Sequence, residues 1–179
     1  MSARHTRVLL SSCFCGKVQI EAAGAAIVTA ACYCASCQAA GHRFEQMCPS
    51  TPVLERDGGT GFVLYRKDRV CCTKGEALLR EYRLRPESTT RRVLANCCNS
   101  AMFLEFTKGH WLSLYRNRFE AGAPPIEVRT MTKDKRPDVE FADDVPSPDT
   151  HSASFMWKLL AAWIAMGLRT PTITYGKAP

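Results

Sequence analysis

The sequence predicts a mainly β fold followed by a C-terminal helix. Short runs of apolar and β-branched residues recur along most of the chain between glycine-rich or polar turns, which is typical of consecutive strands. A long helical segment is evident only after residue 152, where an apolar run continues to Gly167. With 179 residues, 46% of them hydrophobic and 23% charged, the chain can bury a core of its own. A chain that is disordered throughout is therefore excluded.

Each predicted strand is a stretch where apolar residues alternate with polar ones or run together between turn signals. In chain order we expect strands at 8–10, 18–21, 27–29, 62–65, 70–73, 78–84, 93–98, 102–107, 111–115 and 126–131. Gly16, Gly24 and the glycine-rich segment 57–61 mark turns between them. Residues 38–45 are expected to form a loop or a short helix.

The chain divides into three segments by composition. Residues 1–132 hold all the predicted strands and are expected to form one β domain. Residues 133–151 are rich in Asp, Pro and Ser, so we expect a linker or surface loop. Residues 152–179 hold the helix, with Ser152 or Ser154 as its cap, and a tail. Because the helix carries apolar residues on more than one face, we expect it to dock on the same domain or on a partner.

Ten cysteines are the most unusual feature of the composition. The apolar run near the N-terminus, Val8 to Leu10, is too short for a signal-peptide core. The longest apolar stretch, 155–168, is interrupted by Lys158 and is too short to span a bilayer. We therefore expect a cytoplasmic protein with reduced thiols and no membrane partner.

Seven of the cysteines lie in three short knots. Cys13 and Cys15 form the first knot, and a Cys-x-Cys-x-x-Cys segment that begins at Cys32 forms the second. The adjacent pair at 97–98 is the third. Cysteines this close in sequence do not easily reach disulfide geometry with one another, but they can converge on one metal ion. Because thiolates are soft ligands that suit zinc, we predict one or two zinc ions.

The second knot, with Cys32, Cys34 and Cys37, can surround one ion by itself. Three protein ligands and one open position are typical of catalytic zinc, whereas structural zinc usually has four. The fourth position would then be left to water or an incoming thiolate. The alternative is that a distant cysteine closes the site and makes it purely structural.

The first knot needs ligands from elsewhere, and Cys97 and Cys98 are the candidates. Adjacent residues of a strand point to opposite faces, so both can bind one ion only if the backbone turns there. Otherwise Cys98 is the ligand and Cys97 a buried thiol. The remaining cysteines, Cys48, Cys71 and Cys72, are expected to be small buried side chains.

The knots resemble the motifs of the glutathione-dependent formaldehyde-activating enzyme (GFA) family, also called the centromere-protein-V domain. Residues 12–18 read Ser-Cys-Phe-Cys-Gly-Lys-Val and resemble its opening Gly-x-Cys-x-Cys-Gly-x-Val motif. The segment from Cys32 to Gln38 resembles its second motif. Residues 94–102 match the third, Phe-Cys-x-x-Cys-Gly-[Ser/Thr]-x-Leu, with Ala95 in place of its first cysteine and Asn99 in place of its glycine.

The resemblance, which covers roughly residues 8–120, implies a β-tent fold of small antiparallel sheets. It implies a structural zinc held by the first and third motifs and a reactive zinc held by Cys32, Cys34 and Cys37. It also implies a carbon–sulfur lyase that forms S-hydroxymethylglutathione, so a small thiol such as glutathione is the expected partner. Four basic residues near the motifs are candidates to hold the glutathione carboxylates. They are His42, Arg43, Lys108 and His110.

The net charge of +7 allows a different function. The stretch from Arg66 to Arg92 contains nine Lys or Arg residues but only four Asp or Glu residues. This stretch is either the solvated face of several strands or a surface for an anionic ligand. A non-catalytic zinc module that binds a protein or nucleic acid is therefore the alternative function. Only Tyr82 lies among the basic residues as an aromatic, which disfavours single-stranded nucleic acid.

Overall fold

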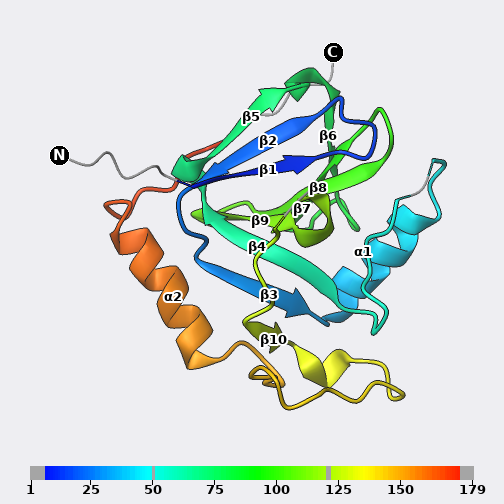
Figure 1. The fold of residues 1–179 in the computed structure, drawn as a ribbon, viewed down its shortest axis with the longest axis vertical. Helices are drawn as coiled ribbons and strands as arrows, with labels where there is room; N and C mark the ends of the chain where they lie inside the picture. The colour runs from blue at the N-terminus through cyan, green and yellow to red at the C-terminus, as the bar shows by residue number, and fades with distance from the viewer. Residues whose placement is uncertain (1–6, 50, 120–121, 174–179) are drawn as a thin grey trace.

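The computed structural model describes residues 7–49, 51–119 and 122–173, and its chain is mainly β with a C-terminal helix, as predicted (Figure 1). The strands described are β1 (Val8–Ser12), β2 (Gln19–Ala23), β3 (Val28–Cys32), β4 (Thr60–Arg66), β5 (Val70–Lys74), β6 (Leu79–Tyr82), β7 (Thr90–Ala95), β8 (Ser100–Phe106), β9 (Trp111–Tyr115) and β10 (Val128–Thr130). The α-helices are α1 (Ala35–Glu45) and α2 (Ala153–Ile164).

The strands form two sheets. The smaller has the order β1-β2-β5, and the larger has the order β10-β3-β4-β9-β8-β7-β6. Neighbouring strands are antiparallel except for β10, which runs parallel to β3. The larger sheet thus differs from the small antiparallel sheets that the resemblance implies. Its parallel pair joins strands that are far apart in the sequence, since β10 pairs with β3.

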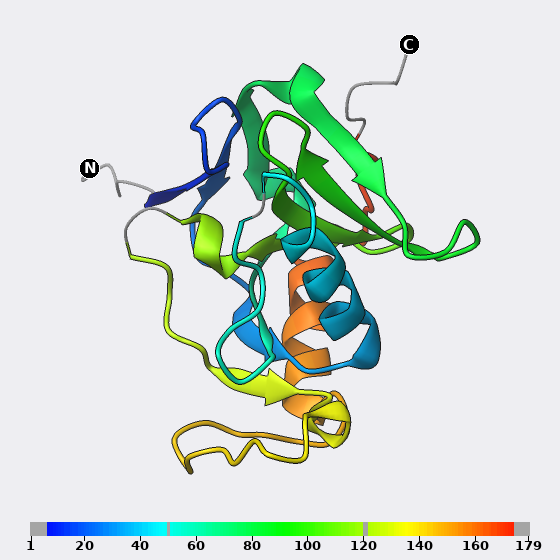
Figure 2. The ribbon, with the colours of Figure 1, turned by 90° about the vertical axis from the view of Figure 1, so that its right-hand side faces the viewer.

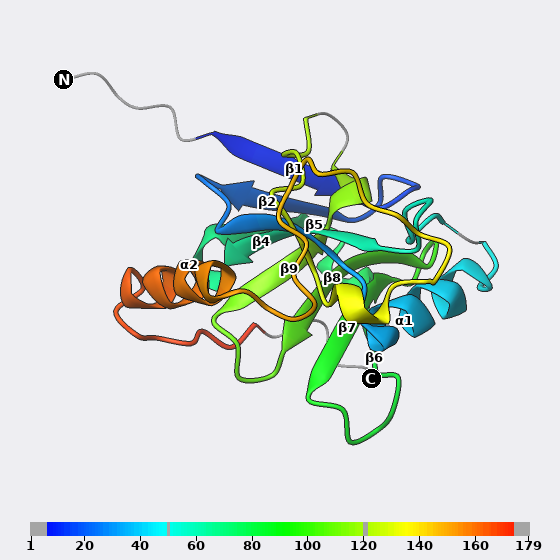
Figure 3. The same ribbon diagram turned by 90° about the horizontal axis from the view of Figure 1, so that it is seen from below.

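The seven-stranded sheet is buried on both faces, which explains the continuous apolar run of β4. Val63 and Tyr65 pack with the small sheet in a first hydrophobic cluster. Phe62 and Leu64, on the alternate face, pack with both helices in a second cluster. Figure 3 shows this layering, with β1 and β2 on one side of β4 and the helices on the other. Each face of the large sheet therefore has its own core.

The two helices cover opposite ends of the second face (Figures 1 and 2). Helix α1 buries Phe44, and helix α2 buries Phe155 and Leu159. Helix α2 begins as expected at Ser152, whose Oγ accepts a hydrogen bond from the backbone N–H of Phe155 at 3.1 Å. Four large apolar side chains of α2 are exposed to solvent. They are Met156, Trp157, Leu160 and Ile164.

Helix α2 is held to the sheet by polar contacts as well as by its buried side chains. The buried His110 imidazole donates through Nε2 to the carbonyl oxygen of Leu159 at 2.8 Å and stacks on Trp163. Lys158 forms an ion pair with Glu127 at 2.6 Å. Neither α1 nor α2, nor any other helix in the described part of the chain, is long and apolar enough to cross a membrane.

The basic stretch is partly neutralised by ion pairs within the chain. Lys67 is fully buried and meets the equally buried Glu105 at 2.5 Å. Arg91 contacts the same carboxylate at 2.6 Å and also pairs with Glu81. The local charge excess of the sequence is therefore not a simple solvated basic face.

Candidate metal centres

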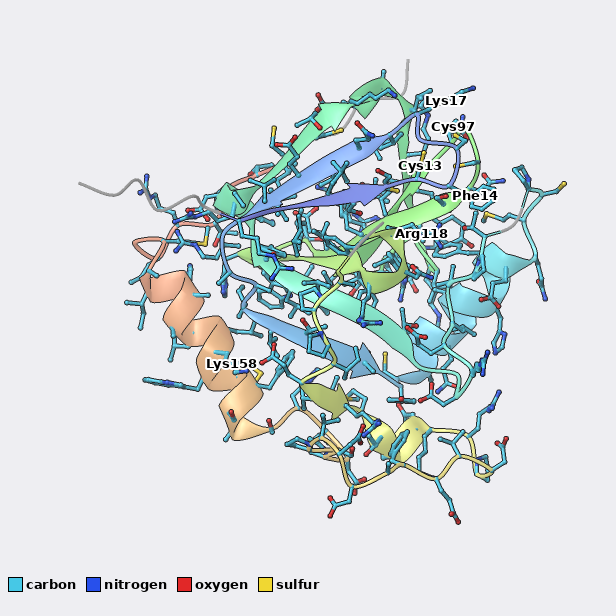
Figure 4. All side chains as sticks on the ribbon, in the orientation of Figure 1. Cys13, Phe14, Lys17, Cys97, Arg118 and Lys158 are labelled. Atoms are coloured by element: carbon cyan, nitrogen blue, oxygen red, sulfur yellow. The ribbon has the colours of Figure 1, made fainter. Side chains whose placement is uncertain are left out.

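Four cysteines meet between the small sheet and the large one. Cys13 and Cys15 lie in the loop between β1 and β2, and Cys97 and Cys98 lie between β7 and β8. All four Sγ atoms lie within 4.8 Å of one another. Figure 4 shows Cys13 and Cys97 side by side at the tip of the β1–β2 hairpin. We call these residues the four-cysteine site.

The sulfur–sulfur distances match those required around a tetrahedral ion. Cys15 and Cys97 are 3.4 Å apart, Cys13 and Cys15 are 3.6 Å apart, and Cys97 and Cys98 are 3.9 Å apart. A tetrahedral ion with metal–sulfur bonds of about 2.3 Å places its sulfurs about 3.8 Å apart. The four Sγ atoms are therefore close enough together to share one ion.

A tight turn brings the first two thiols together. The N–H of Gly16 donates to the carbonyl oxygen of Cys13 at 2.9 Å, and the N–H of Val18 donates to the Cys13 Sγ at 3.2 Å. Gly16 has a φ of 69°, a conformation that glycine adopts without strain. Burial raises the pKa of the Cys13 thiol, and this backbone hydrogen bond partly offsets that shift.

Both Cys97 and Cys98 join this site because the backbone turns at this point. Strand β7 ends at Ala95 and β8 begins at Ser100, so the prediction of a strand up to residue 98 was wrong. Asn99 has a φ of 53° and takes the left-handed conformation that the family motif assigns to glycine. Asn tolerates this conformation better than most residues. The turn therefore removes the obstacle that adjacent strand residues point to opposite faces.

The four-cysteine site is shielded and lies beside a buried cation. Cys13 and Cys98 are each only 3% exposed. Burial acts to raise the pKa of Cys98, but hydrogen bonds from Ser100 and the backbone outweigh it and lower the pKa to about 6. The buried guanidinium of Arg118 interacts electrostatically with Cys98 and Cys13. Burial raises the pKa of Cys13 and of Cys97, so within this site the surroundings favour negative charge on Cys98.

Three further cysteines meet on the other face of the large sheet, where β3 passes directly into α1. Cys32 ends the strand, Cys34 is the N-cap of the helix, and Cys37 lies in its first turn. Their Sγ atoms lie within 4.8 Å of one another. The N–H groups of Cys37 and Gln38 donate to the carbonyl oxygen of Cys34 at 2.9 and 3.2 Å. We call these residues the three-cysteine site.

The three-cysteine site has no fourth side-chain ligand among the described residues. The group of His, Cys, Asp and Glu side chains close enough to share an ion consists of Cys32, Cys34 and Cys37 alone. Hydrogen bonds from Cys32 and Cys37 lower the pKa of Cys34, and the same contact with Cys34 raises the pKa of Cys32. The cluster therefore favours the thiolate form of Cys34, and the thiolate is the form of cysteine that binds a metal.

A buried arginine lies beside these thiols. Arg92 is 1% exposed and donates through Nη2 to the carbonyl oxygen of Ser36, between Cys34 and Cys37, at 3.0 Å. Within the described ranges, its Nε has no hydrogen-bond partner and no carboxylate forms an ion pair with it. A buried cation without an anion is costly. Three thiolates around a divalent ion carry one net negative charge, so the donor set fits a metal that also satisfies Arg92.

A cavity of about 480 Å³ opens beside the three-cysteine site. Cys32, Cys34 and Cys37 form part of its wall. Side chains of the large sheet form another part, and Phe155, Met156 and Leu159 of α2 lie in the wall together with His151. The volume lies in the range of small-molecule sites. The open side of the three-cysteine site therefore faces a space large enough for a ligand.

Sequence reasoning missed two polar residues of this region. Arg92 looked like one of many surface cations, and His151 fell in the predicted linker. His151 lines the cavity, its Nδ1 lies 2.7 Å from the hydroxyl of Thr130, and its ring stacks on Phe155 at 5.1 Å. Burial lowers the pKa of His151. No local pattern in the sequence places either residue near the cysteines.

The four basic candidates for glutathione binding are not among the described residues that line this cavity. His42 and Arg43 are exposed on α1, and Lys108 lines a different hollow with Lys67 and Arg83. His110 is buried against α2, as described above. The structure therefore does not bring these residues together around the thiols.

The prediction that the three remaining cysteines are buried was wrong. Cys48 and Cys71 are exposed, and Cys72 is partly buried against the first hydrophobic cluster. Cys48 lies beyond the end of α1, and Cys71 and Cys72 lie on β5, which is an edge strand of the small sheet. An edge strand of a three-stranded sheet offers too little cover to bury both faces. All ten cysteines are free thiols.

Comparison with known proteins gives little beyond the structure itself. No model of a known protein family matches the sequence, and no curated protein matches it. A crystal structure of a protein from Rhodobacter sphaeroides is similar to this chain, with 14% sequence identity and a TM-score of 0.48. The match covers 78% of this chain and 100% of that one. The resemblance to the formaldehyde-activating family stays a prediction.

Proposed function

We propose that this chain is a zinc protein in which the four-cysteine site is structural and the three-cysteine site is reactive. The observation that supports this is the cavity: it adjoins the three-cysteine site, whose ion would have only three side-chain ligands among the described residues. Zinc is the metal we favour, because all the donors are thiolates and tetrahedral sulfur sites are typical of zinc.

The reaction class we propose is the reversible joining of a thiol to a carbonyl compound. The thiol sulfur forms a bond to the carbonyl carbon, the C=O π bond breaks, and the thiol proton moves to the carbonyl oxygen. When bound to the three thiolates, zinc would supply a Lewis acid and would hold a thiol in its thiolate form. In the reverse direction the same step is a carbon–sulfur lyase reaction, the activity that the family resemblance implies.

Two residues of this chain support that chemistry. Arg92 donates to the carbonyl oxygen of Ser36, between Cys34 and Cys37, and we assign it the task of offsetting the negative charge of the three thiolates. His151 lies in the cavity wall, and its lowered pKa keeps the imidazole neutral at pH 7. Its contact with Thr130 fixes the ring. We assign His151 the task of moving the proton between the thiol and the carbonyl oxygen.

The test joins metal counting to a rate measurement. Zinc-loaded wild-type protein is expected to hold two equivalents, Cys34→Ser one, and Cys48→Ser, a control at an exposed cysteine, two. The rate of adduct formation from formaldehyde is then followed by NMR with either glutathione or phenylmethanethiol. Acceleration by wild type and Cys48→Ser but not by Cys34→Ser supports the proposal. Equal rates with wild type and Cys34→Ser for both thiols would overturn it.

A further inference from the structure

We infer that the cavity beside the three-cysteine site binds the uncharged, apolar part of a thiol or aldehyde substrate, such as an aryl or alkyl group. This inference rests on the proposed function, because it names the substrate class of the same site. It departs from the ionic tripeptide glutathione that the family resemblance implies.

The walls of the cavity are apolar on the sides that the sheet and α2 provide. Strand β4 contributes Phe62 and Leu64, and β8 contributes Leu104. Helix α2 contributes Phe155 and Leu159 from across the cavity. These side chains belong to the second hydrophobic cluster, so the cavity is a gap in a core. A ligand that fills it gains affinity by burying apolar surface.

No Lys, Arg, Asp or Glu side chain lines the cavity among the residues that the structure describes. Its polar lining consists of the three thiols, hydroxyl groups such as those of Ser113 and Thr130, and the His151 imidazole. Glutathione carries two carboxylates and one ammonium group at neutral pH. Placing such charges in this cavity would remove them from water without an opposite partner, which is strongly unfavourable. The chemistry of the wall thus selects against an ionic substrate.

The first experiment compares three ligands on the zinc-loaded, full-length chain by calorimetric titration. The probes are phenylmethanethiol, its alcohol analogue phenylmethanol, and glutathione. We expect phenylmethanethiol to bind at least about tenfold more tightly than glutathione, since only this benzylic thiol can both bind the metal and fill the apolar part of the cavity. Equal or tighter binding of glutathione, or no binding of either phenyl compound, would overturn the inference.

The alcohol analogue separates this inference from the proposed function. If phenylmethanol binds as tightly as phenylmethanethiol while glutathione does not bind, the apolar cavity is real but the metal offers no open position for sulfur. That result supports the substrate class and contradicts the reactive zinc site.

A matched pair of variants locates the binding site. Met156 and Trp157 are neighbours on α2, and both are half-exposed or more, but only Met156 lines the cavity. Met156→Glu is expected to weaken phenylmethanethiol binding at least about fivefold because a carboxylate enters the apolar wall, and Trp157→Glu less than about twofold. Both variants should keep two zinc equivalents. Equal effects of the two substitutions would place the ligand elsewhere and contradict the inference.

Discussion

The two cysteine clusters use the same ligand chemistry on opposite faces of one sheet, yet they differ in how the chain supplies the ligands. The four-cysteine site joins two turns that are far apart in sequence: Cys13 and Cys97, whose sulfurs are in contact, are separated by 84 residues. The three-cysteine site takes all its ligands from six consecutive residues at a strand-to-helix junction. Two converging segments enclose an ion, whereas one short segment leaves its other side open. Closure of such a site therefore depends on the number of chain segments that meet there.

The surroundings of the two clusters differ in the same direction. Cys13 and Cys98 belong to the first hydrophobic cluster, which binds the small sheet to the large one. Cys37 belongs to the second cluster, but its neighbours there also form the wall of a cavity. The four-cysteine site is thus placed to hold the fold together, and the three-cysteine site is placed to meet a ligand.

The largest expected effect is on thermal stability, and its size should differ between substitutions at the two sites. Cys98→Ser is expected to lower the melting temperature by about 10 °C or more, because structural zinc contributes its binding free energy to folding. Cys34→Ser should lower it by about 4 °C or less, since the β3–α1 junction keeps its backbone hydrogen bonds. Scanning calorimetry with Cys48→Ser as a control measures both. A larger loss for Cys34→Ser than for Cys98→Ser would reverse the assignment of roles.

The second prediction concerns the arginines, one of which accompanies each site. Arg92→Met is expected to weaken zinc binding at the three-cysteine site by about 10- to 100-fold and to leave the four-cysteine site unchanged. Arg118→Met should have the opposite selectivity, because its guanidinium interacts with Cys98 and Cys13. Competition with a chelator of known affinity measures each site in turn. If both variants weakened the same site, the pairing of arginine with cluster would be refuted.

A smaller difference is expected in the rate of metal release. The open site should lose zinc to an excess of a colorimetric chelator at least about tenfold faster than the closed one, because the chelator can attack the free coordination position. The time course should therefore show two phases of equal amplitude. Cys34→Ser should lack the fast phase, and release in a single phase from wild type would argue that the two sites are equally accessible.

The smallest expected effect is a pH dependence of the stability of the fold. It arises at His110, which contacts helix α2 beside the open site. Burial lowers the pKa of His110 in the folded state below its unfolded value of about 6.5. The unfolded state then binds more protons at mildly acidic pH, so stability is constant above about pH 6.5 and falls as pH decreases below it. His110→Gln can keep a donor for Leu159 and should flatten this decline in urea unfolding between pH 5 and 7.5. Parallel pH profiles would show that His110 does not contribute.

Much of the fold could be predicted because its signals are local. Strands such as β4 and β9 coincide with apolar runs bounded by turns, and Ser152 is a standard helix cap. The strand predicted at 93–98 was too long because Cys97 and Cys98 continue its apolar run. The chain turns at Asn99, which has a left-handed conformation, but a single Asn is not a strong sequence signal for a turn. The pairing of β10 with β3 depends on long-range contacts that no sequence window contains.

The candidate sites were predictable to the extent that their ligands are close in sequence. Cys32, Cys34 and Cys37 form a recognisable spacing, and the structure brings them together. Arg92 and His151 could not be found in this way, since they reach the site from β7 and from the segment before α2. Their roles depend on burial and on the cavity, which exist only after the sheet has formed.

The most direct measurement of the central claim is optical spectroscopy of the cobalt-substituted protein. Two Co²⁺ ions are expected, one with four thiolate ligands and one with three. Addition of phenylmethanethiol should shift the d–d bands and raise the sulfur-to-cobalt charge-transfer absorption of one ion only, as the three-cysteine site gains a fourth sulfur. Cys34→Ser should abolish the change and Cys48→Ser should retain it. A spectrum unaffected by the thiol, or a change that persists in Cys34→Ser, would contradict an open metal site at this cavity.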